Sequence, residues 1–330
     1  MAIRFSLHGS IRNISQGIQR AKQAEELGFE GIFIADSQTT CLDPFQALAI
    51  CATHTKRLRL ATAVTNMVYR DPTVLAGSAA TLNEISDGRA ILGMGTGDGP
   101  VYSLGRKATP IAKFEQGLKT MRELLQGKAA EFPTGKVSLK IGKLPVPLYV
   151  SLEGPRGLPV AGKLADGVIL GSGFDLRVLQ WAKEKIAQGA AQVGRSPADI
   201  ELIAAGMICV DKDGDRARAT VRARLANRAH HNFRFTLETV PPEELDGVKK
   251  FMEAFDIMRP LENRLDPSYI TDYLVRRFSI AGTPEECAAR VREIAQAGMS
   301  HFMLTPPERI YNEMVEAWSK EVMPHFQGAR

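Results

Sequence analysis

Apolar residues along this chain form short runs that alternate with segments in which apolar positions recur every three or four residues. A bounded apolar run is typical of a buried strand, whereas the wider spacing indicates a helix packed by one face. In residues 57–99, two such runs, Leu58–Val64 and Ala90–Gly95, flank a helical segment. The apolar positions of that segment are Val74, Leu75, Ala79, Leu82 and Ile85. This order predicts a strand, a crossover helix and a second strand parallel to the first.

The same alternation continues through most of the chain and supplies eight strands. The predicted strands are Ile3–His8, Gly31–Asp36, Leu58–Val64, Ala90–Gly95, Pro147–Leu152, Gly167–Leu170, Leu202–Val210 and His301–Leu304. Further predicted helices are Ile14–Leu27, Pro44–His54, Ala112–Leu125, Gly154–Leu164, Leu176–Val193, Thr283–Ala297 and Glu308–Met323. Eight strand–helix units close naturally into an α/β (β/α)₈ TIM barrel, which we expect to be a single domain over residues 1–330. An open, doubly wound sheet is the alternative, because periodicity alone does not show closure.

Two segments interrupt the alternation. Glu131–Leu144 carries the turn residues Pro133, Thr134 and Gly135 and predicts a hairpin excursion before strand five. A longer stretch, from about Asp213 to Tyr273, predicts a helical insertion after strand seven. Because loops select the substrate in barrel enzymes, these two segments are the expected selectors.

Composition narrows the class of protein. The chain is 44% hydrophobic and 24% charged, as is usual for a soluble globular protein. No apolar run reaches the length of a membrane span, and the first residues do not resemble a secretory signal, so we expect a cytoplasmic protein without membrane contact. The cysteines lack the spacing of metal ligands, so we expect reduced thiols and no metal site; they are Cys41, Cys51, Cys209 and Cys287.

The net charge of +5 is modest for 330 residues. It is compatible with a phosphate-bearing or anionic ligand but is too small to indicate a nucleic-acid partner. One segment is more strongly basic, and its members are Arg216, Arg218, Arg222, Arg224, Arg228, His230, His231 and Arg234. Because no aromatic residues suited to base stacking interleave this run, we interpret it as a solvated, largely helical face.

Polar residues follow most of the predicted strands, where a barrel gathers its catalytic groups. His8 follows strand one, Asp36 strand two and Asp98 strand four, and these three are the candidate catalytic residues. A histidine can titrate near neutrality, and the two carboxylates can act as general bases or can bind a backbone amide or a cofactor ring. The other polar residues at strand ends are Thr62, Thr65, Asn66, Thr96, Ser151, Glu153 and Ser172.

Two small-residue loops are compatible with a phosphate. Gly154-Pro155-Arg156-Gly157 opens a short helix, whose first N–H groups are free to bind an anion. Gly171-Ser172-Gly173 follows strand six in the same way. Each loop alone is better explained as a tight turn, but the two loops together suggest a cofactor tail. The glycines at 93, 95, 97 and 99 do not have the Gly-x-Gly-x-x-Gly spacing, so a Rossmann site is not predicted.

Long motifs then identify a family resemblance. Ala63–Pro72, Ala80–Asp98 and Gly282–Glu286 resemble segments of the luciferase-like flavin oxidoreductases, in particular the branch with methylenetetrahydromethanopterin reductase. The resemblance extends to Gln23–Phe29 and Ala165–Gly173. It implies a TIM barrel, often dimeric, that binds FMN or the 5-deazaflavin coenzyme F420 at its carboxyl-terminal mouth.

The resemblance also implies the positions of the cofactor-binding residues. A non-proline cis peptide is expected at Ala63–Val64, where the backbone supports the flavin ring from behind. The residues expected near the ring are Asp36, Ala63, Val64, Thr65, Asn66, Gly97 and Asp98. Those expected near the ribityl-phosphate are Ser151, Gly154, Pro155, Gly171, Ser172 and Gly173, and Glu153 is a further expected cofactor-binding residue. Two departures stand out: Asp36-Ser37 replaces the Asp-His of many deazaflavin enzymes, and Ala63 and Met67 replace the usual glycine and proline.

Three functions are compatible with these features. The leading hypothesis is a reduced-FMN-dependent monooxygenase acting on a small organic molecule, supplied with reduced FMN by a separate flavin reductase. The alternative is deazaflavin-dependent hydride transfer to a C=N, C=C or carbonyl group. A non-catalytic flavin-binding or partner protein is the third. Under each hypothesis we expect the chain to form a homodimer. In both catalytic hypotheses the cofactor carries the hard chemical step.

Overall fold

Eight parallel strands form a closed ring in the computed structural model, which describes residues 2–256 and 265–326. Each strand pairs with the next, and the last, β12, pairs with both β10 and β1. The predicted TIM barrel is therefore confirmed, and an open sheet is excluded. In ring order the strands are β1 (Arg4–Gly9), β2 (Gly31–Ile34), β3 (Arg59–Thr62), β5 (Ala90–Gly95), β8 (Leu148–Val150), β9 (Gly167–Leu170), β10 (Glu201–Val210) and β12 (His301–Thr305).

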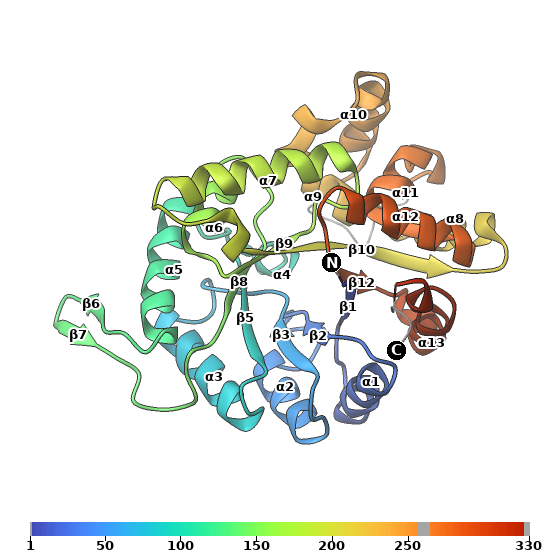
Figure 1. Ribbon diagram of the computed structural model, residues 1–330. Coiled ribbons are helices and arrows are strands. Elements are labelled where there is room, and N and C mark those ends of the chain that lie inside the picture. Colours follow the sequence, from blue (N-terminus) through green and yellow to red (C-terminus); the bar gives the residue numbers. More distant parts are fainter. Residues whose placement is uncertain (1, 257–264, 327–330) are drawn as a thin grey trace.

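Helices surround this ring, as Figure 1 shows. The outer helices are α1 (Ile14–Glu26), α2 (Pro44–Thr53), α3 (Pro72–Ile85), α5 (Ile111–Leu125), α6 (Gly157–Leu164), α7 (Leu176–Ala191), α12 (Pro284–Gln296) and α13 (Tyr311–Glu321). Between them lie the short 3₁₀ helices η1 (Pro197–Asp199), η2 (Leu237–Thr239), η3 (Pro242–Glu244), η4 (Pro267–Tyr269), η5 (Glu308–Ile310) and η6 (Met323–His325). Within the described residues, no helix is both long and apolar enough to cross a membrane.

The helix between β3 and β5 forms as predicted, but its buried face differs. Leu75, Ala79 and Leu82 are buried, whereas Val74 and Ile85 remain 54% and 44% exposed. Small residues, together with Asn83, complete the buried stripe of α3. Asn83 is buried because its side chain hydrogen-bonds backbone groups, including the amide of Ala90 at 3.1 Å. Periodicity favoured large apolar side chains, but the close approach of helix to sheet selects small ones.

Two strands differ from the sequence prediction. The run Leu58–Val64 ends as a strand at Thr62, and β4 (Thr65–Asn66) then pairs with β5. Thr65 and Asn66 therefore form a strand where we expected a strand end. A further strand, β11 (Ser279–Gly282), was not predicted; it pairs with the second half of β10. Its four residues are too short for periodicity to distinguish them from the preceding helix.

The two predicted interruptions are present with different limits. The antiparallel hairpin consists only of β6 (Ala130–Phe132) and β7 (Gly135–Val137). The insertion contains α8 (Gly214–Arg222), α9 (Ala226–Thr236), α10 (Leu245–Ala254) and α11 (Asp272–Phe278), and α4 (Gly99–Tyr102) follows β5. The insertion after β10 extends beyond its predicted end at Tyr273, because α11 runs directly into β11. Residues 257–264 of the predicted insertion lie outside the described residues.

Inside the barrel, the amino-terminal end is filled by a charged network. The Glu201 carboxylate accepts a hydrogen bond from His301 Nδ1 at 2.7 Å and pairs with Arg4 at 2.7 Å and Arg59 at 3.3 Å. Tyr149 also donates its hydroxyl to Glu201. Above this network, apolar side chains fill the barrel: Phe33, Ala61, Ile91, Ile169, Ile203, Ala205 and Met303. The described side chains therefore fill the barrel at its amino-terminal end, and the carboxyl-terminal mouth is the end where a cavity opens.

We predict that Glu201→Gln destabilises the protein by about 2 kcal/mol at pH 7, because Arg4 and Arg59 lose their nearer charged partner in a partly buried site and are left with the longer contacts to Glu30, at 3.6 and 3.8 Å. Burial alone would raise the pKa of Glu201, but hydrogen bonds from His301 and Tyr149 and the neighbouring charges outweigh it and hold the pKa far below its ordinary value. A depressed folded-state pKa stabilises the protein above the unfolded value of about 4.5, and this contribution is lost as the pH falls below it.

Urea denaturation of the wild type and of Glu201→Gln at pH 7 and pH 4 checks this prediction. The stability difference should shrink at the lower pH. The exposed pair Glu316–Lys320 gives the control Glu316→Gln, for which we expect less than about 0.5 kcal/mol at either pH. An equal loss in both variants would contradict the prediction.

Candidate active site

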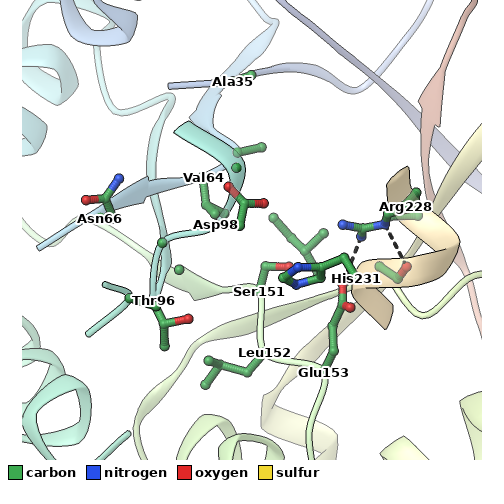
Figure 2. A pocket seen from close by; sticks show the side chains of 18 of the residues that line it. Ala35, Val64, Asn66, Thr96, Asp98, Ser151, Leu152, Glu153, Arg228 and His231 are labelled. Atoms are coloured by element: carbon green, nitrogen blue, oxygen red, sulfur yellow. Dashed lines mark hydrogen bonds and ion pairs between the residues drawn. The ribbon is translucent and has the colours of Figure 1, made fainter. Parts of the chain in front are cut away.

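A cavity of about 770 Å³ opens at the carboxyl-terminal ends of the barrel strands. This volume suits a cofactor-sized ligand. Figure 2 shows that side chains from several strand ends and from α9 point into it. Of the predicted site residues, the cavity brings together His8, Asp36, Ala63, Val64, Thr65, Asn66, Gly97, Asp98, Ser151, Glu153, Gly154, Pro155 and Gly171.

The wall of the cavity at β3 is a backbone bulge. The Ala63–Val64 peptide bond is cis, as the family resemblance implied. Thr62 replaces the missing strand pairing, because its hydroxyl donates to the Gly93 carbonyl at 2.8 Å and accepts from the Gly93 amide at 2.9 Å. A Cβ at Gly93 would overlap the Thr62 carbonyl, and one at Gly95 would lie 2.6 Å from Val64. The repeated glycines of β5 therefore serve the close approach of the bulge and not a dinucleotide loop.

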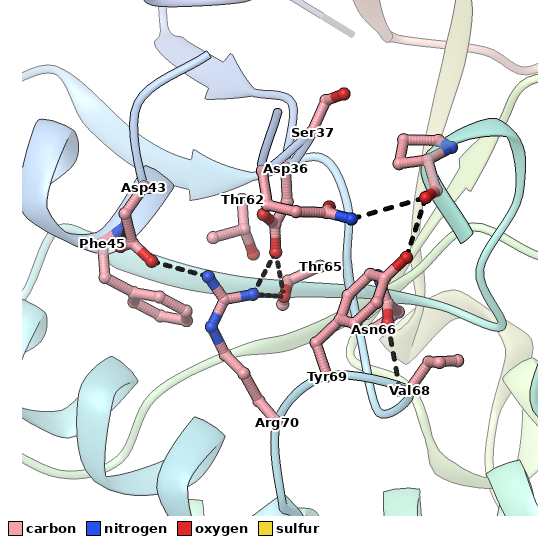
Figure 3. Close-up of polar contacts among 12 residues, drawn as sticks. Asp36, Ser37, Asp43, Phe45, Thr62, Thr65, Asn66, Val68, Tyr69 and Arg70 are labelled. Atoms are coloured by element: carbon pink, nitrogen blue, oxygen red, sulfur yellow. Dashed lines mark hydrogen bonds and ion pairs between the residues drawn. The ribbon is translucent and has the colours of Figure 1, made fainter. Parts of the chain in front are cut away.

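Asp36 lines the cavity and is held by an arginine behind it. Its Oδ2 atom pairs with Arg70 and accepts a hydrogen bond from the Thr65 hydroxyl at 2.7 Å. Arg70 also binds Asp43 at 2.6 Å, and Asp43 caps the start of α2 through the amides of Phe45 and Gln46. Figure 3 shows this chain of contacts. Asp36 is thus fixed in position and charge-paired, which favours a binding role for it over that of a free base.

His8 lies between two strand ends. Its Nε2 atom contacts the Ala63 carbonyl at 3.2 Å, and its Nδ1 atom contacts the Thr305 hydroxyl at 3.1 Å. Because a carbonyl oxygen only accepts, Nε2 carries the proton and Nδ1 accepts from Thr305. Burial lowers the pKa of His8 to about 4. The hydrogen bond to the Ala63 carbonyl acts against this shift, whereas the positive charge of Arg228 adds to it. The expectation that His8 titrates near neutrality is therefore wrong; it is a neutral imidazole bonded at both nitrogens.

Glu153 is a buried carboxylate whose charge is compensated by side chains of α9, the helix that follows α8 in the insertion. Only 5% of its side chain is exposed, and its oxygens bind Arg228 at 2.9 Å and the Asn232 amide at 2.9 Å. Asn232 in turn accepts a hydrogen bond from the fully buried Arg277 at 3.1 Å. Burial alone would raise the pKa of Glu153, but Arg228, His231 and the Asn232 hydrogen bond together lower it below its ordinary value. Glu153 is therefore ionised.

The two remaining predicted residues do not line the cavity. Ser172 is buried, and its hydroxyl has no hydrogen-bond partner among the described residues. Gly173 has a φ of +91°, and a Cβ there would overlap the Arg277 carbonyl. Both therefore pack behind the cavity wall, so the structure does not bring them together with the lining residues. Asp98, by contrast, is exposed at the start of α4 and makes no side-chain capping bond.

Sequence reasoning missed the contribution of the insertion. Arg224, Asn227, Arg228, His231 and Arg234 all line the cavity, and four of the five come from α9. The interpretation of the basic run as a solvated face is therefore wrong for this part. The spacing of residues 227, 231 and 234 places them on one face of α9, but no sequence signal shows that this face meets the barrel mouth.

Comparisons with known proteins agree with this architecture. Residues 3–301 match the family model for luciferase-like monooxygenases. The chain belongs to the luciferase-like monooxygenase family. It is 29% identical to the 5,10-methylenetetrahydromethanopterin reductase of Methanolobus tindarius, over 87% of this chain and 89% of that one. It is 24% identical to the F420-dependent glucose-6-phosphate dehydrogenase of Beutenbergia cavernae, over 92% and 91%.

A solved structure shows the same fold. The F420-dependent tetrahydromethanopterin reductase of Methanopyrus kandleri superposes with a TM-score of 0.81 at 24% identity, covering 99% of this chain and all of that one. The predicted family and branch are thus confirmed, and this luciferase-like chain is an oxidoreductase. The residues assigned to its cofactor site stay a prediction.

We predict that Gly171→Ala destabilises the protein by about 1 kcal/mol, because the added Cβ would displace the Arg228 guanidinium and so weaken its pairing with the buried Glu153 carboxylate. Chemical denaturation measures the effect. Gly99 also lines the cavity, but a Cβ there meets nothing within 4 Å, so Gly99→Ala is the matched control and should change stability by less than about 0.5 kcal/mol. Equal stability of the two variants would refute the proposed packing.

Proposed function

We propose that this chain transfers a hydride between coenzyme F420 and a C=N, C=C or carbonyl group of a small organic substrate. The observation that carries the proposal is the near end-to-end match to reductases and F420-dependent dehydrogenases, combined with a cavity at the barrel mouth whose wall is the Ala63–Val64 bulge. The comparisons support this alternative better than reduced-FMN monooxygenation, which was our leading expectation. Reduced-FMN monooxygenation is supported by the description of the family model and by solved structures with lower sequence identity.

The residues of the cavity fit a large, acidic, ring-containing coenzyme. The Val64 side chain sits over Gly95, which offers an apolar support for a flat ring. Beside it, Asn66 uses its Oδ1 atom to accept the Val68 amide at 3.0 Å, which leaves its NH₂ group as a donor. Towards the mouth, Arg156, Arg224 and Arg234 have no carboxylate partner among the described residues, so they provide positive charge for an acidic tail.

Each part of this cavity has a physical role in the proposed reaction. When bound, F420 supplies the hydride chemistry. The apolar side chains of Ile169 and Met303 close the floor of the cavity and exclude water. His8 stays neutral and hydrogen-bonds the Ala63 carbonyl, which fixes the bulge. The Asp98 carboxylate lies at the mouth, makes no hydrogen bond or ion pair with a residue that the structure describes, and is the candidate to exchange a proton with the substrate.

We predict that the purified protein binds F420 more tightly than FMN and that Asn66→Leu weakens F420 binding about tenfold, the effect of losing one hydrogen bond beside the ring. Fluorescence titration measures both affinities. Gln188→Leu changes an exposed amide on α7 outside the cavity and should leave binding unchanged. Tight FMN binding together with oxygen-dependent turnover, and no F420 binding, would overturn the proposed function in favour of monooxygenation.

Asp98→Ala tests the proposed proton exchange. Because Asp98 makes no capping bond in α4, its removal should leave the far-UV circular dichroism nearly unchanged. Turnover should fall by about 100-fold, the usual contribution of a positioned acid or base. Unchanged turnover in a folded variant would remove Asp98 from the mechanism without affecting the cofactor assignment.

A further inference from the structure

The guanidinium of Arg228 is fixed at the cavity wall by two different elements. Its Nη2 atom pairs with Glu153 at 2.9 Å, and its Nε atom donates to the Gly171 carbonyl at 3.0 Å. Gly171 has no side chain, and a Cβ there would occupy the position of the guanidinium. The Glu153 carboxylate and the Gly171 carbonyl therefore hold one edge of the Arg228 guanidinium, and the missing side chain at Gly171 leaves room for it.

The other side of Arg228 faces the cavity. A guanidinium has five N–H groups, and these two contacts use only two of them. The Arg228 side chain is 40% exposed and lines the cavity, so its remaining donors are available to a ligand. His231, one turn later on α9, points into the same space, as Figure 2 shows. Its ring makes no hydrogen bond with any residue that the structure describes.

The local charge balance favours an anion. Glu153 is the carboxylate in contact with Arg228, and through Asn232 it also compensates the buried Arg277. The single negative charge of Glu153 therefore compensates two cations, Arg228 directly and Arg277 through Asn232. A purely structural ion pair would need neither the donors that face the cavity nor this excess of positive charge. Arginine held in this way is suited to bidentate binding of phosphate or carboxylate.

We propose that Arg228, assisted by His231, is an anion-binding site for a phosphate or carboxylate group of a ligand in this cavity. The group comes either from the coenzyme, as its phosphate, or from the substrate, as an acidic substituent. The first source rests on the proposed function, whereas the second does not. In both cases Glu153 acts as a positioning residue that holds the guanidinium.

The test compares the wild type with two variants. Arg228→Lys keeps the charge but loses the planar donor edge. Because removal of Arg228 alone would leave Glu153 buried and unpaired, the double variant Glu153→Gln/Arg228→Gln removes both charges together. Arg218→Lys is the matched control, since Arg218 of α8 pairs with Asp215 of α8 and Glu286 of α12 and does not line the cavity. Circular dichroism establishes that each variant is folded.

The first arm measures binding of F420 and of its truncated form, which has the ring and ribityl chain without phosphate. If Arg228 binds the coenzyme phosphate, the wild type prefers F420 by about tenfold or more, and both Arg228 variants lose this preference. Their affinity for the truncated form stays unchanged.

The second arm measures binding of inorganic phosphate by ³¹P NMR, to the coenzyme-free and F420-loaded protein at constant ionic strength. If Arg228 serves an acidic substrate, phosphate binds the loaded wild type and is weakened about tenfold in both variants, while their F420 affinity is unchanged. Arg218→Lys should match the wild type in both arms.

The proposal is overturned if both folded Arg228 variants keep the preference for F420 and the affinity for phosphate within twofold of the wild type. It is also overturned if the wild type shows neither preference nor phosphate binding. Failure of the wild type to bind F420 would instead refute the proposed function, and the phosphate titration of the coenzyme-free protein would then decide the role of Arg228.

Discussion

The close approach of the β3 bulge to β5 is the contact on which the site depends. Thr62 satisfies both the amide and the carbonyl of Gly93, so the strands stay joined where regular pairing is interrupted. Glycine at 93 and 95 is required, since any side chain there would collide with the bulge. Because pairing resumes at β4, the displacement is confined to Ala63 and Val64, which form part of the cavity wall.

The charged groups of the barrel are divided between its two ends. At the amino-terminal end, Glu201 pairs with two arginines and His301, and this network closes the barrel. At the mouth, Asp36 and Glu153 are each paired with an arginine, so they are fixed while donors around them remain free. A ligand at the mouth therefore meets preorganised polar groups, which cost little reorganisation on binding.

Much of the fold could be predicted from the chain because its signals are local. Apolar runs and helical spacing identified the eight barrel strands and the main helices, and the glycine-rich end of β5 indicated the site. The predictions that failed depend on contacts between distant residues. Val74 and Ile85 are exposed because the helix contacts its neighbours through small residues, and β11 became recognisable only by its pairing with β10.

The sequence by itself predicted the barrel, the family and a set of strand-end residues that line the mouth, because strand ends of a parallel barrel must meet on one face. Only the tertiary structure decided what those residues can do. It placed α9 against Gly171 and so converted part of a basic run into a cavity wall with Arg228 and His231. It also bonded both nitrogens of His8 and buried the ring, which keeps that histidine neutral. These outcomes depend on packing between segments tens to hundreds of residues apart, and a local pattern carries no information about it.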